Sequence, residues 1–210
     1  VNLINFINNI YIMNLIYYTY FIGADNYIGN GALGLFIPQY PGNNKYKCYF
    51  YTNDNNTYKQ LKQDNPNDDI DKWIGIYVKY NSNDENEANE YGKFYRACPH
   101  LLDELKSSDY TCYVDTKVQG LNEGSIISLI YENFILQNKA MLLRSHNFIN
   151  NSVLHELSEA IKQNRYKLQQ KRYEKYIDNQ VKNHGKKTST ESRHLATGFI
   201  LRNMKHEKVN

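Results

Sequence analysis

The sequence predicts an α/β domain with a mostly parallel sheet flanked by helices, and three observations carry this prediction. Short runs of aromatic and β-branched residues recur along the chain, and helical patterns stand between several of them. The clearest run, 110–118, carries a carboxylate, Asp115, near its end. Strands that alternate with helices are typical of parallel sheets, and an open α/β sheet usually presents ligand-binding groups after the carboxyl ends of its strands.

The expected strands are bounded by glycine or by clusters of polar residues. Gly23 breaks the first apolar run, Asn53-Asp-Asn-Asn56 closes the second, and a polar segment over 63–71 precedes the third. Helical spacing of apolar residues separates several of the later runs, and Pro99 should kink the first helix. The strands are expected at 14–23, 46–52, 73–80, 110–118, 140–144 and 195–202, and the helices at 86–105, 125–136, 153–163 and 167–182.

The composition and the N-terminal sequence argue against several classes of function. A formal net charge of +3 on 210 residues gives no strong case for binding nucleic acid or an anionic membrane. The apolar stretch 3–22 is broken by asparagines and lacks a basic start and a cleavage site, so we expect neither a signal peptide nor a transmembrane helix. A cytoplasmic location is favoured for the chain as given. Because Met13 precedes the first strand, we expect residues 1–12 to be an appendage to a single domain over 13–210.

The cysteines Cys48, Cys98 and Cys112 show no spacing typical of zinc sites, and we expect them to be reduced structural thiols. The basic, tyrosine-containing segment 167–176 could stack on RNA bases, but acids at 174 and 178 interrupt the region. An ordinary amphipathic helix is the favoured interpretation of that segment.

One group of candidate ligand-binding residues precedes the Asp115 strand. Lys93, Arg96 and His100 stand at i, i+3 and i+7, so on one helix they would share a face, which could lie near the carboxyl end of that strand. Three nitrogen donors beside a carboxylate could hold a diphosphate, whereas a solvated basic stripe explains the same spacing without a ligand.

Further candidates lie near the last two strands. Arg144 and His146 close one strand, and His194, Thr197 and Gly198 enter the other, where they could bind hydroxyls or phosphate or simply form a turn. Glu156 follows His155 without the His-Glu-x-x-His spacing of zinc proteases. It could be an acid, a base or an acceptor for a sugar hydroxyl, although a surface glutamate is the commoner explanation.

In their order along the chain, these segments resemble the glycosyltransferase-like domain of the plant turgor-regulation-defect and mucilage-related proteins. Ile16-Tyr-Tyr-Thr-Tyr-Phe-Ile-Gly23 is similar to the family's first strand but one residue longer, and Phe50-Tyr-Thr-Asn53 is similar to the end of its second. Arg96-Ala-Cys-Pro-His100 and Tyr113-Val-Asp-Thr-Lys117 resemble Lys-x-x-Pro-His and Trp-Ile-Asp-Gly-Lys/Asn, with Arg for Lys and Thr for Gly. Later segments match in the same order: Arg144-Ser-His146, His155-Glu156 and Leu195-Ala-Thr-Gly-Phe-Ile-Leu-Arg202.

The resemblance implies a glycosyltransferase-A-like, Rossmann-like fold and an enzyme that transfers a sugar from a nucleotide-sugar donor to a glycan, protein or lipid acceptor. Many such transferases carry a metal-binding Asp-x-Asp after this strand, and here Lys117 replaces the second acid. Asp115 would bind ribose or a diphosphate-bound Mn²⁺ or Mg²⁺, with weaker metal dependence than an Asp-x-Asp enzyme shows. The implied catalytic residues are Asp115, Lys117 and Glu156, and the implied donor-binding residues are Thr19, Phe21, Gly23, Lys93, Arg96, His100, Arg144, His146, His194, Thr197 and Gly198.

Two other functions stay open. The family has been linked to hydrolysis of sphingolipid amides, which would need an activated water. A non-catalytic module that binds a sugar or a nucleotide is the third class. The family normally continues with an aromatic helix and an Arg-Asp-Gln segment, so we expect that this chain lacks the C-terminal part of the domain.

Overall fold

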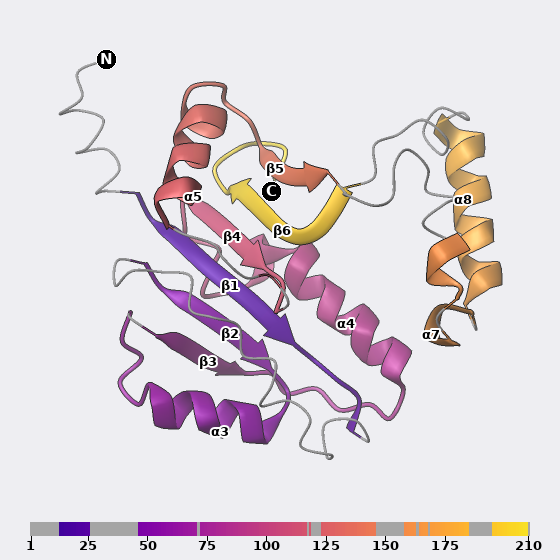
Figure 1. Ribbon diagram of the computed structural model, residues 1–210, viewed down its shortest axis with the longest axis horizontal. Coiled ribbons are helices and arrows are strands. Elements are labelled where there is room, and N and C mark those ends of the chain that lie inside the picture. The colour runs from indigo at the N-terminus through magenta and orange to yellow at the C-terminus, as the bar shows by residue number, and fades with distance from the viewer. Residues whose placement is uncertain are drawn as a thin grey trace. The chain divides into compact units, whose positions relative to one another are not determined.

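The computed structural model describes residues 13–25, 46–70, 72–116, 118, 123–145, 158–162, 164–167, 169–184 and 195–209. Within these ranges it contains a six-stranded sheet in the order β3-β2-β1-β4-β6-β5, flanked by helices (Figure 1). The strands are β1 (Leu15–Phe21), β2 (Cys48–Thr52), β3 (Trp73–Tyr77), β4 (Tyr110–Val114), β5 (Met141–Ser145) and β6 (Leu195–Asn203). The helices are α3 (Asn55–Asp64), α4 (Glu85–Ala97), α5 (Glu123–Ile130), α7 (Asn164–Lys167) and α8 (Gln170–His184), with a 3₁₀ turn at Pro99–Leu101 and a π-helical turn at Tyr131–Ile135.

The sheet is mostly parallel, and its strand order reverses beside β1. β1 pairs in parallel with β2 and with β4, β2 pairs in parallel with β3, and β6 pairs antiparallel with β4. The chain therefore moves outward from β1 through β2 to β3, and then returns through α4 to place β4 on the other side of β1. The expected α/β class with a mostly parallel sheet is confirmed.

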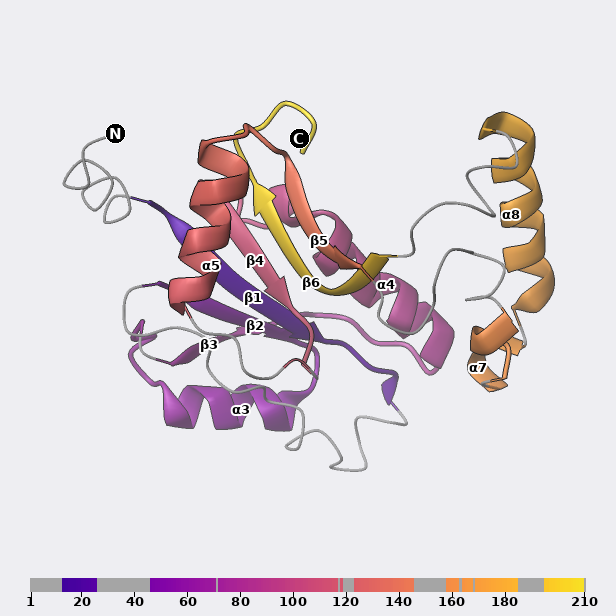
Figure 2. The ribbon, with the colours of Figure 1, turned by 45° about the horizontal axis from the view of Figure 1, so that its top comes forward.

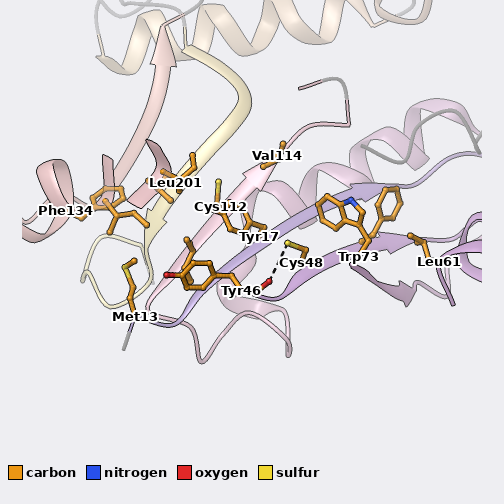
Figure 3. Close-up of a cluster of buried hydrophobic side chains, with 14 residues drawn as sticks. Met13, Tyr17, Tyr46, Cys48, Leu61, Trp73, Cys112, Val114, Phe134 and Leu201 are labelled. Carbon is orange, nitrogen blue, oxygen red and sulfur yellow. Dashed lines mark hydrogen bonds between the residues drawn. The ribbon is translucent and has the colours of Figure 1, made fainter. Parts of the chain in front are cut away.

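One face of the sheet carries the hydrophobic core. Alternate residues of the strands point to this face, and Leu61 of α3 and Ile126 and Ile130 of α5 join the same buried cluster. The Phe50 and Trp73 rings meet edge to face, with centroids 6.0 Å apart. Figure 3 shows this cluster, in which Met13, Tyr17, Cys48, Cys112, Val114 and Leu201 also take part. Burying each large apolar side chain contributes about 1.5–3 kcal/mol to folding.

The opposite face is a layer of tyrosines beneath α4. Tyr20 stacks on Tyr113 with ring centroids 5.7 Å apart, and Tyr95 of α4 lies 5.1 Å from Tyr51. The helix can approach this layer closely because it carries glycine at position 92, where a Cβ would lie only 2.7 Å from Cε2 of Tyr20. The turned view in Figure 2 shows α4 on the face of the sheet away from α5.

Helix α3 was not expected from the sequence. Asp54 caps it, because its carboxylate accepts hydrogen bonds from the backbone amides of Asn56 and Thr57 at 3.4 and 2.8 Å. Only Thr57 and Leu61 of this helix are buried, so its apolar stripe is narrow and most of its residues are polar. The sequence pattern therefore suggested a turn at 53–56 where a capped helix begins.

The other expected elements agree with the structure except at their ends. All six strands are present, but the helix expected over 86–105 ends at Ala97 and is followed by the 3₁₀ turn. The helix expected over 125–136 becomes a π-helical turn after Ile130. The appendage expected over 1–12 and most of the helix expected over 153–163 lie outside the described residues.

The chain divides into two compact units. The first comprises residues 1–142 and 198–210, and the second comprises residues 143–197. Within the second, α8 buries Ile177, and the rings of Tyr166 and Tyr173 lie 6.3 Å apart. Whether 13–210 folds as one domain stays a prediction. Among the helices that the structure describes, none is long and apolar enough to cross a membrane.

Candidate functional site

The candidate site lies where the strand order reverses, at the carboxyl ends of β1 and β4. These neighbouring strands are parallel, so both end at the same edge of the sheet. In open α/β sheets, ligands bind outside the carboxyl ends of the two strands at such a switch point, because the segments that follow them turn in opposite directions. Here that point lies between Phe21, the last residue of β1, and Asp115, the first residue after β4.

The segment that follows β1 is tied toward β2 and β3. The side-chain amide of Asn53 donates to the carbonyl oxygens of Gly23 (2.9 Å) and Tyr80 (3.1 Å), and its oxygen accepts from the amide of Gly23 (3.1 Å). Further along, the amide of Asp25 donates to the carbonyl of Ser82 at 2.8 Å. In Figure 1 the segment after β1 meets the loop that leads into α4. The chain after β1 therefore leaves the switch point on the side away from β4.

The segment that follows β4 is tied in the other direction, to β6. The amide of Asp115 donates to the carbonyl of Gly198 at 2.7 Å, and the amide of Val118 donates to the carbonyl of Asp115 at 2.9 Å. A Cβ on Gly198 would lie 3.6 Å from Cβ of Asp115, so β6 passes directly beside this residue. Asp115 is partly buried and sits in a short turn at the end of a stiff strand. The sequence prediction that it follows the carboxyl end of a central strand is confirmed.

Tyr113 brings Asp115 and Arg96 into one electrostatic environment. Burial raises the pKa of the Tyr113 hydroxyl well above its usual range, and Tyr20 and the Asp115 carboxylate raise this pKa further. The Arg96 guanidinium opposes that shift and lowers the Tyr113 pKa. The carboxylate that follows β4 and a cation from α4 therefore both act on the Tyr113 phenol, with opposite effects on its pKa.

His100 does not continue the helical face that carries Lys93 and Arg96, so the expectation that all three share one face is wrong. Helix α4 ends at Ala97, and His100 lies in the separate 3₁₀ turn that begins at Pro99. The helix connects the carboxyl end of β3 with the amino end of β4 and therefore runs opposite to the strands, which takes His100 away from Asp115. Nδ1 of His100 is buried, with no hydrogen-bond partner in the part of the chain that the structure describes. A role for Lys93 and His100 in binding a donor stays a prediction.

The β1 candidates differ in how they are placed. Thr19 is fully buried, and its hydroxyl has no hydrogen-bond partner within the described ranges. Phe21 is partly buried and packs against the core cluster. Gly23 is buried and bonds through its backbone to Asn53. The segment after β1 is therefore held at the edge of the sheet chiefly through backbone groups.

The remaining sequence candidates fall in two groups. Arg144 of β5 and Thr197 of β6 are exposed and belong to the second compact unit. The other five lie outside the described residues: Lys117, His146, His155, Glu156 and His194.

Sequence reasoning missed two residues that organise this region. Asn53 joins the segments after three neighbouring strands, as described above. Arg202 of β6 is 4% exposed, and it donates to the Tyr18 hydroxyl at 3.0 Å and to the backbone carbonyl of Arg96 at 2.6 Å. Asn53 is the last residue of Phe50–Asn53 and Arg202 is the last residue of Leu195–Arg202, and both segments resemble family motifs. Their places in these motifs were the sequence signal that could have identified them.

Within the described ranges, Asp115 is a single carboxylate and not part of a metal-binding cluster. Among the residues that the structure describes, no group of three or more His, Cys, Asp or Glu side chains is placed to hold a metal ion. Mg²⁺ is commonly held by one or two carboxylates together with substrate phosphates. A carboxylate such as Asp115 suits an Mg²⁺ ion that a diphosphate also holds.

Comparisons with known proteins identify a family and find matches among solved structures. A crystal structure of mouse xyloside xylosyltransferase 1, in its apo form, matches with a TM-score of 0.45 and 11% sequence identity, over 93% of this chain and 68% of the other. The comparison with curated protein sequences finds no match. The family model described as TOD1/MUCI70, glycosyltransferase-like domain, matches residues 40–209, which is well over half of the chain. The chain belongs to the TOD1/MUCI70 glycosyltransferase-like domain family.

Proposed function

We propose that this domain transfers a sugar from a nucleotide-sugar donor to a glycan, protein or lipid acceptor, with the donor diphosphate bound at the carboxyl ends of β1 and β4. The observation that carries this proposal is the position of Asp115, directly after β4 at the point where the strand order reverses. Membership of a glycosyltransferase-like family supports the reaction class. A glycosyltransferase-A-like arrangement is the form of the fold that this function implies.

The reaction sets clear tasks for the side chains. The bond between the anomeric carbon and the diphosphate oxygen breaks, an acceptor oxygen forms the new bond and loses its proton, and the diphosphate leaves with the electron pair. Cations near the leaving oxygen stabilise the developing charge, which is often the largest contribution to catalysis. Arg96, whose charge acts on the same Tyr113 phenol as the Asp115 carboxylate, is assigned as one such cation, and Lys117 is assigned the same task from its sequence position. Glu156, His146 and His194 are assigned to hydroxyl groups of the donor or acceptor.

Asp115 would bind the donor ribose or a divalent ion carried by the diphosphate. A bound Mn²⁺ or Mg²⁺ would supply positive charge to the leaving group. Lys117 supplies a positive charge two residues after Asp115, where an Asp-x-Asp enzyme has a second carboxylate. We therefore expect activity to depend on manganese less steeply than in an Asp-x-Asp enzyme.

The test compares Asp115→Asn with Asp103→Asn. Asp103 is also a carboxylate, but it is exposed and forms a surface ion pair with Lys106, which makes it a matched control. Release of nucleoside diphosphate from a panel of nucleotide sugars should be lost in Asp115→Asn and retained in Asp103→Asn, while both melt close to the wild type. A donor at about 100 times its dissociation constant should stabilise the wild type by about 2.7 kcal/mol.

Other outcomes would reject this function or this site. Full activity of Asp115→Asn would reject the assigned site. If the wild type binds a donor without turnover, the non-catalytic module is supported instead. Release of fatty acid from a sphingolipid amide, without sugar transfer, would support the hydrolase.

A further inference from the structure

The inference concerns Asn53, a buried amide whose hydrogen bonds tie together the segments that follow three parallel strands. Its side chain is almost fully buried, at 6% exposure. Its oxygen and nitrogen form a pair of hydrogen bonds with the backbone of Gly23, after β1, and the nitrogen also reaches the carbonyl of Tyr80, after β3. Both amide hydrogens and one lone pair of the oxygen are thus used by groups from neighbouring strands.

These contacts determine where the chain goes after β1. Asn53 holds Gly23 on the side of β2 and β3. The hydrogen bond from the amide of Asp25 to the carbonyl of Ser82 holds the next residues on that same side. Without Asn53, the amide and the carbonyl of Gly23 would be buried without these partners and would have to find others. The backbone at the edge of the site would then move, although Asn53 itself lies beside β2 and not beside Asp115.

We infer that Asn53 is a positioning residue: it holds residues 22–25 in the path that leaves the β1–β4 edge open to the diphosphate of the donor. This inference rests on the proposed function. Asn53 touches no reacting atom in this arrangement and acts through the backbone of Gly23. Its loss should weaken donor binding much more than acceptor binding, because the segment that it holds follows β1.

The chain contains a closely matched control in Asn65. This amide is also buried, at 1% exposure, and forms the same kind of paired hydrogen bonds with the backbone of Asp69, at 2.7 and 2.9 Å. It also donates to the carbonyl of Trp73 at 3.2 Å. Asn65 lies between the end of α3 and the start of β3, at the opposite edge of the sheet from Asp115. Asn65 therefore forms the same kind of buried hydrogen bonds as Asn53 but lies away from the candidate site.

The experiment compares Asn53→Ala and Asn65→Ala by melting temperature, kcat and KM for the donor, and by calorimetric binding of the nucleoside diphosphate alone. Both variants should melt lower than the wild type by similar amounts. Asn53→Ala should raise the donor KM and the dissociation constant of the diphosphate about 10- to 100-fold with little change in the acceptor KM, since small misplacements of binding groups cost that much. Asn65→Ala should keep these constants within about twofold of the wild type when assayed well below its melting temperature.

The variant Asn53→Asp gives a second measurement if Asn53→Ala does not fold. It keeps the shape and the acceptor for the Gly23 amide, but it places a carboxylate against two carbonyl oxygens. Lowering the pH toward about 5 should protonate this buried carboxyl and restore one donor, so affinity for the diphosphate should recover relative to the wild type. The inference would be contradicted if Asn53→Asp bound the diphosphate as tightly as the wild type at neutral pH, or if its affinity did not recover at low pH.

The outcomes separate this inference from the proposed function. If the wild type transfers sugar but Asn53→Ala and Asn65→Ala affect donor binding equally, the role of Asn53 is rejected and the function stands. If the wild type neither turns over nucleotide sugars nor binds nucleoside diphosphates, the proposed function is rejected, and the inference is rejected with it.

Discussion

The backbone amide of Asp115 donates a hydrogen bond of 2.7 Å to the carbonyl oxygen of Gly198. This bond extends the β4–β6 pairing by one residue beyond Val114, which pairs with Phe199. The proposed ligand-binding carboxylate is therefore held on its backbone side by an antiparallel strand that comes from the far end of the chain. The position of Asp115 therefore depends on a contact with a residue that lies 83 positions further along the chain.

Replacing Gly198 tests how much room Asp115 needs. A Cβ at this position would lie 3.6 Å from Cβ of Asp115 and 3.5 Å from Cγ2 of Val118, which are ordinary contact distances. Gly198→Ala should therefore raise the free energy of unfolding slightly, by less than about 1 kcal/mol, because alanine has less backbone freedom than glycine in the unfolded chain. Because the new methyl group lies against Asp115, nucleotide-sugar turnover should fall. Denaturant unfolding and activity check the two effects, and a large loss of stability would show that glycine is required for packing.

Arg202 should be important for stability. It is a buried cation, and no carboxylate pairs with it in the part of the chain that the structure describes. Arg202→Met would leave the Tyr18 hydroxyl and the carbonyl of Arg96 without their donor, so it should cost about 2–4 kcal/mol of unfolding free energy. Tyr18→Phe should cost about 1–2 kcal/mol, because it removes one acceptor of a charged hydrogen bond.

The two changes should not be additive. In the double variant Arg202→Met/Tyr18→Phe, neither partner of the 3.0 Å hydrogen bond remains, so the total cost should be smaller than the sum of the single costs. Urea titrations of the three variants measure this coupling. Additive costs would mean that the guanidinium and the phenol stabilise the fold independently.

The ion pair between Asp109 and Lys205 predicts a dependence of stability on pH. Burial alone would raise the pKa of Asp109, but the hydrogen bond from Lys205 and the backbone amide of Asn14 outweigh it and hold this pKa below its usual value. The same pair raises the pKa of Lys205. The Asp109 contribution is thus complete above the ordinary carboxyl pKa of about 4 and is lost as the pH falls through the lowered value in the folded protein.

Asp109→Asn measures this contribution. The variant should be less stable than the wild type at neutral pH by up to about 1 kcal/mol, because the exposed Lys205 partner leaves the pair screened by solvent. The difference should shrink as the pH falls below about 4, because the Asp109 carboxyl of the unfolded wild type then binds a proton more readily than that of the folded protein. Unfolding titrations of both proteins from neutral to acidic pH provide the check. A difference that is constant across this range would assign the effect to shape rather than to charge.

The thiols should react in a fixed order. Cys48 and Cys112 are fully buried, whereas Cys98, the residue after α4, is partly exposed. Burial also raises the pKa of the Cys112 thiol, since it disfavours the thiolate, and the neighbouring Cys48 raises this pKa further. A thiol reagent should therefore modify one group, Cys98, in the native protein and the other two only after unfolding. Rapid modification of Cys112 in the native protein would contradict the buried position of β4.

The sequence by itself determined the six strands and the fact that Asp115 directly follows one of them. The run Tyr110–Val114 is apolar, aromatic and β-branched, and such a local pattern needs no partner to be read as a strand with a carboxylate directly after it. The end of α4 and the start of α3 were missed because capping by Asp54 and the turn at Pro99 depend on local geometry that hydrophobic spacing does not encode.

Only the tertiary structure decided which residues surround Asp115. The order β3-β2-β1-β4-β6-β5 places β6 beside β4, and so brings Gly198 to Asp115 and Arg202 to Tyr18 and Arg96. Likewise, Asn53 meets Gly23 and Tyr80 only because β1, β2 and β3 end at the same edge of the sheet. These contacts join residues far apart in the chain, and hydrophobic periodicity specifies which face of a strand is buried but not which strand lies next to it.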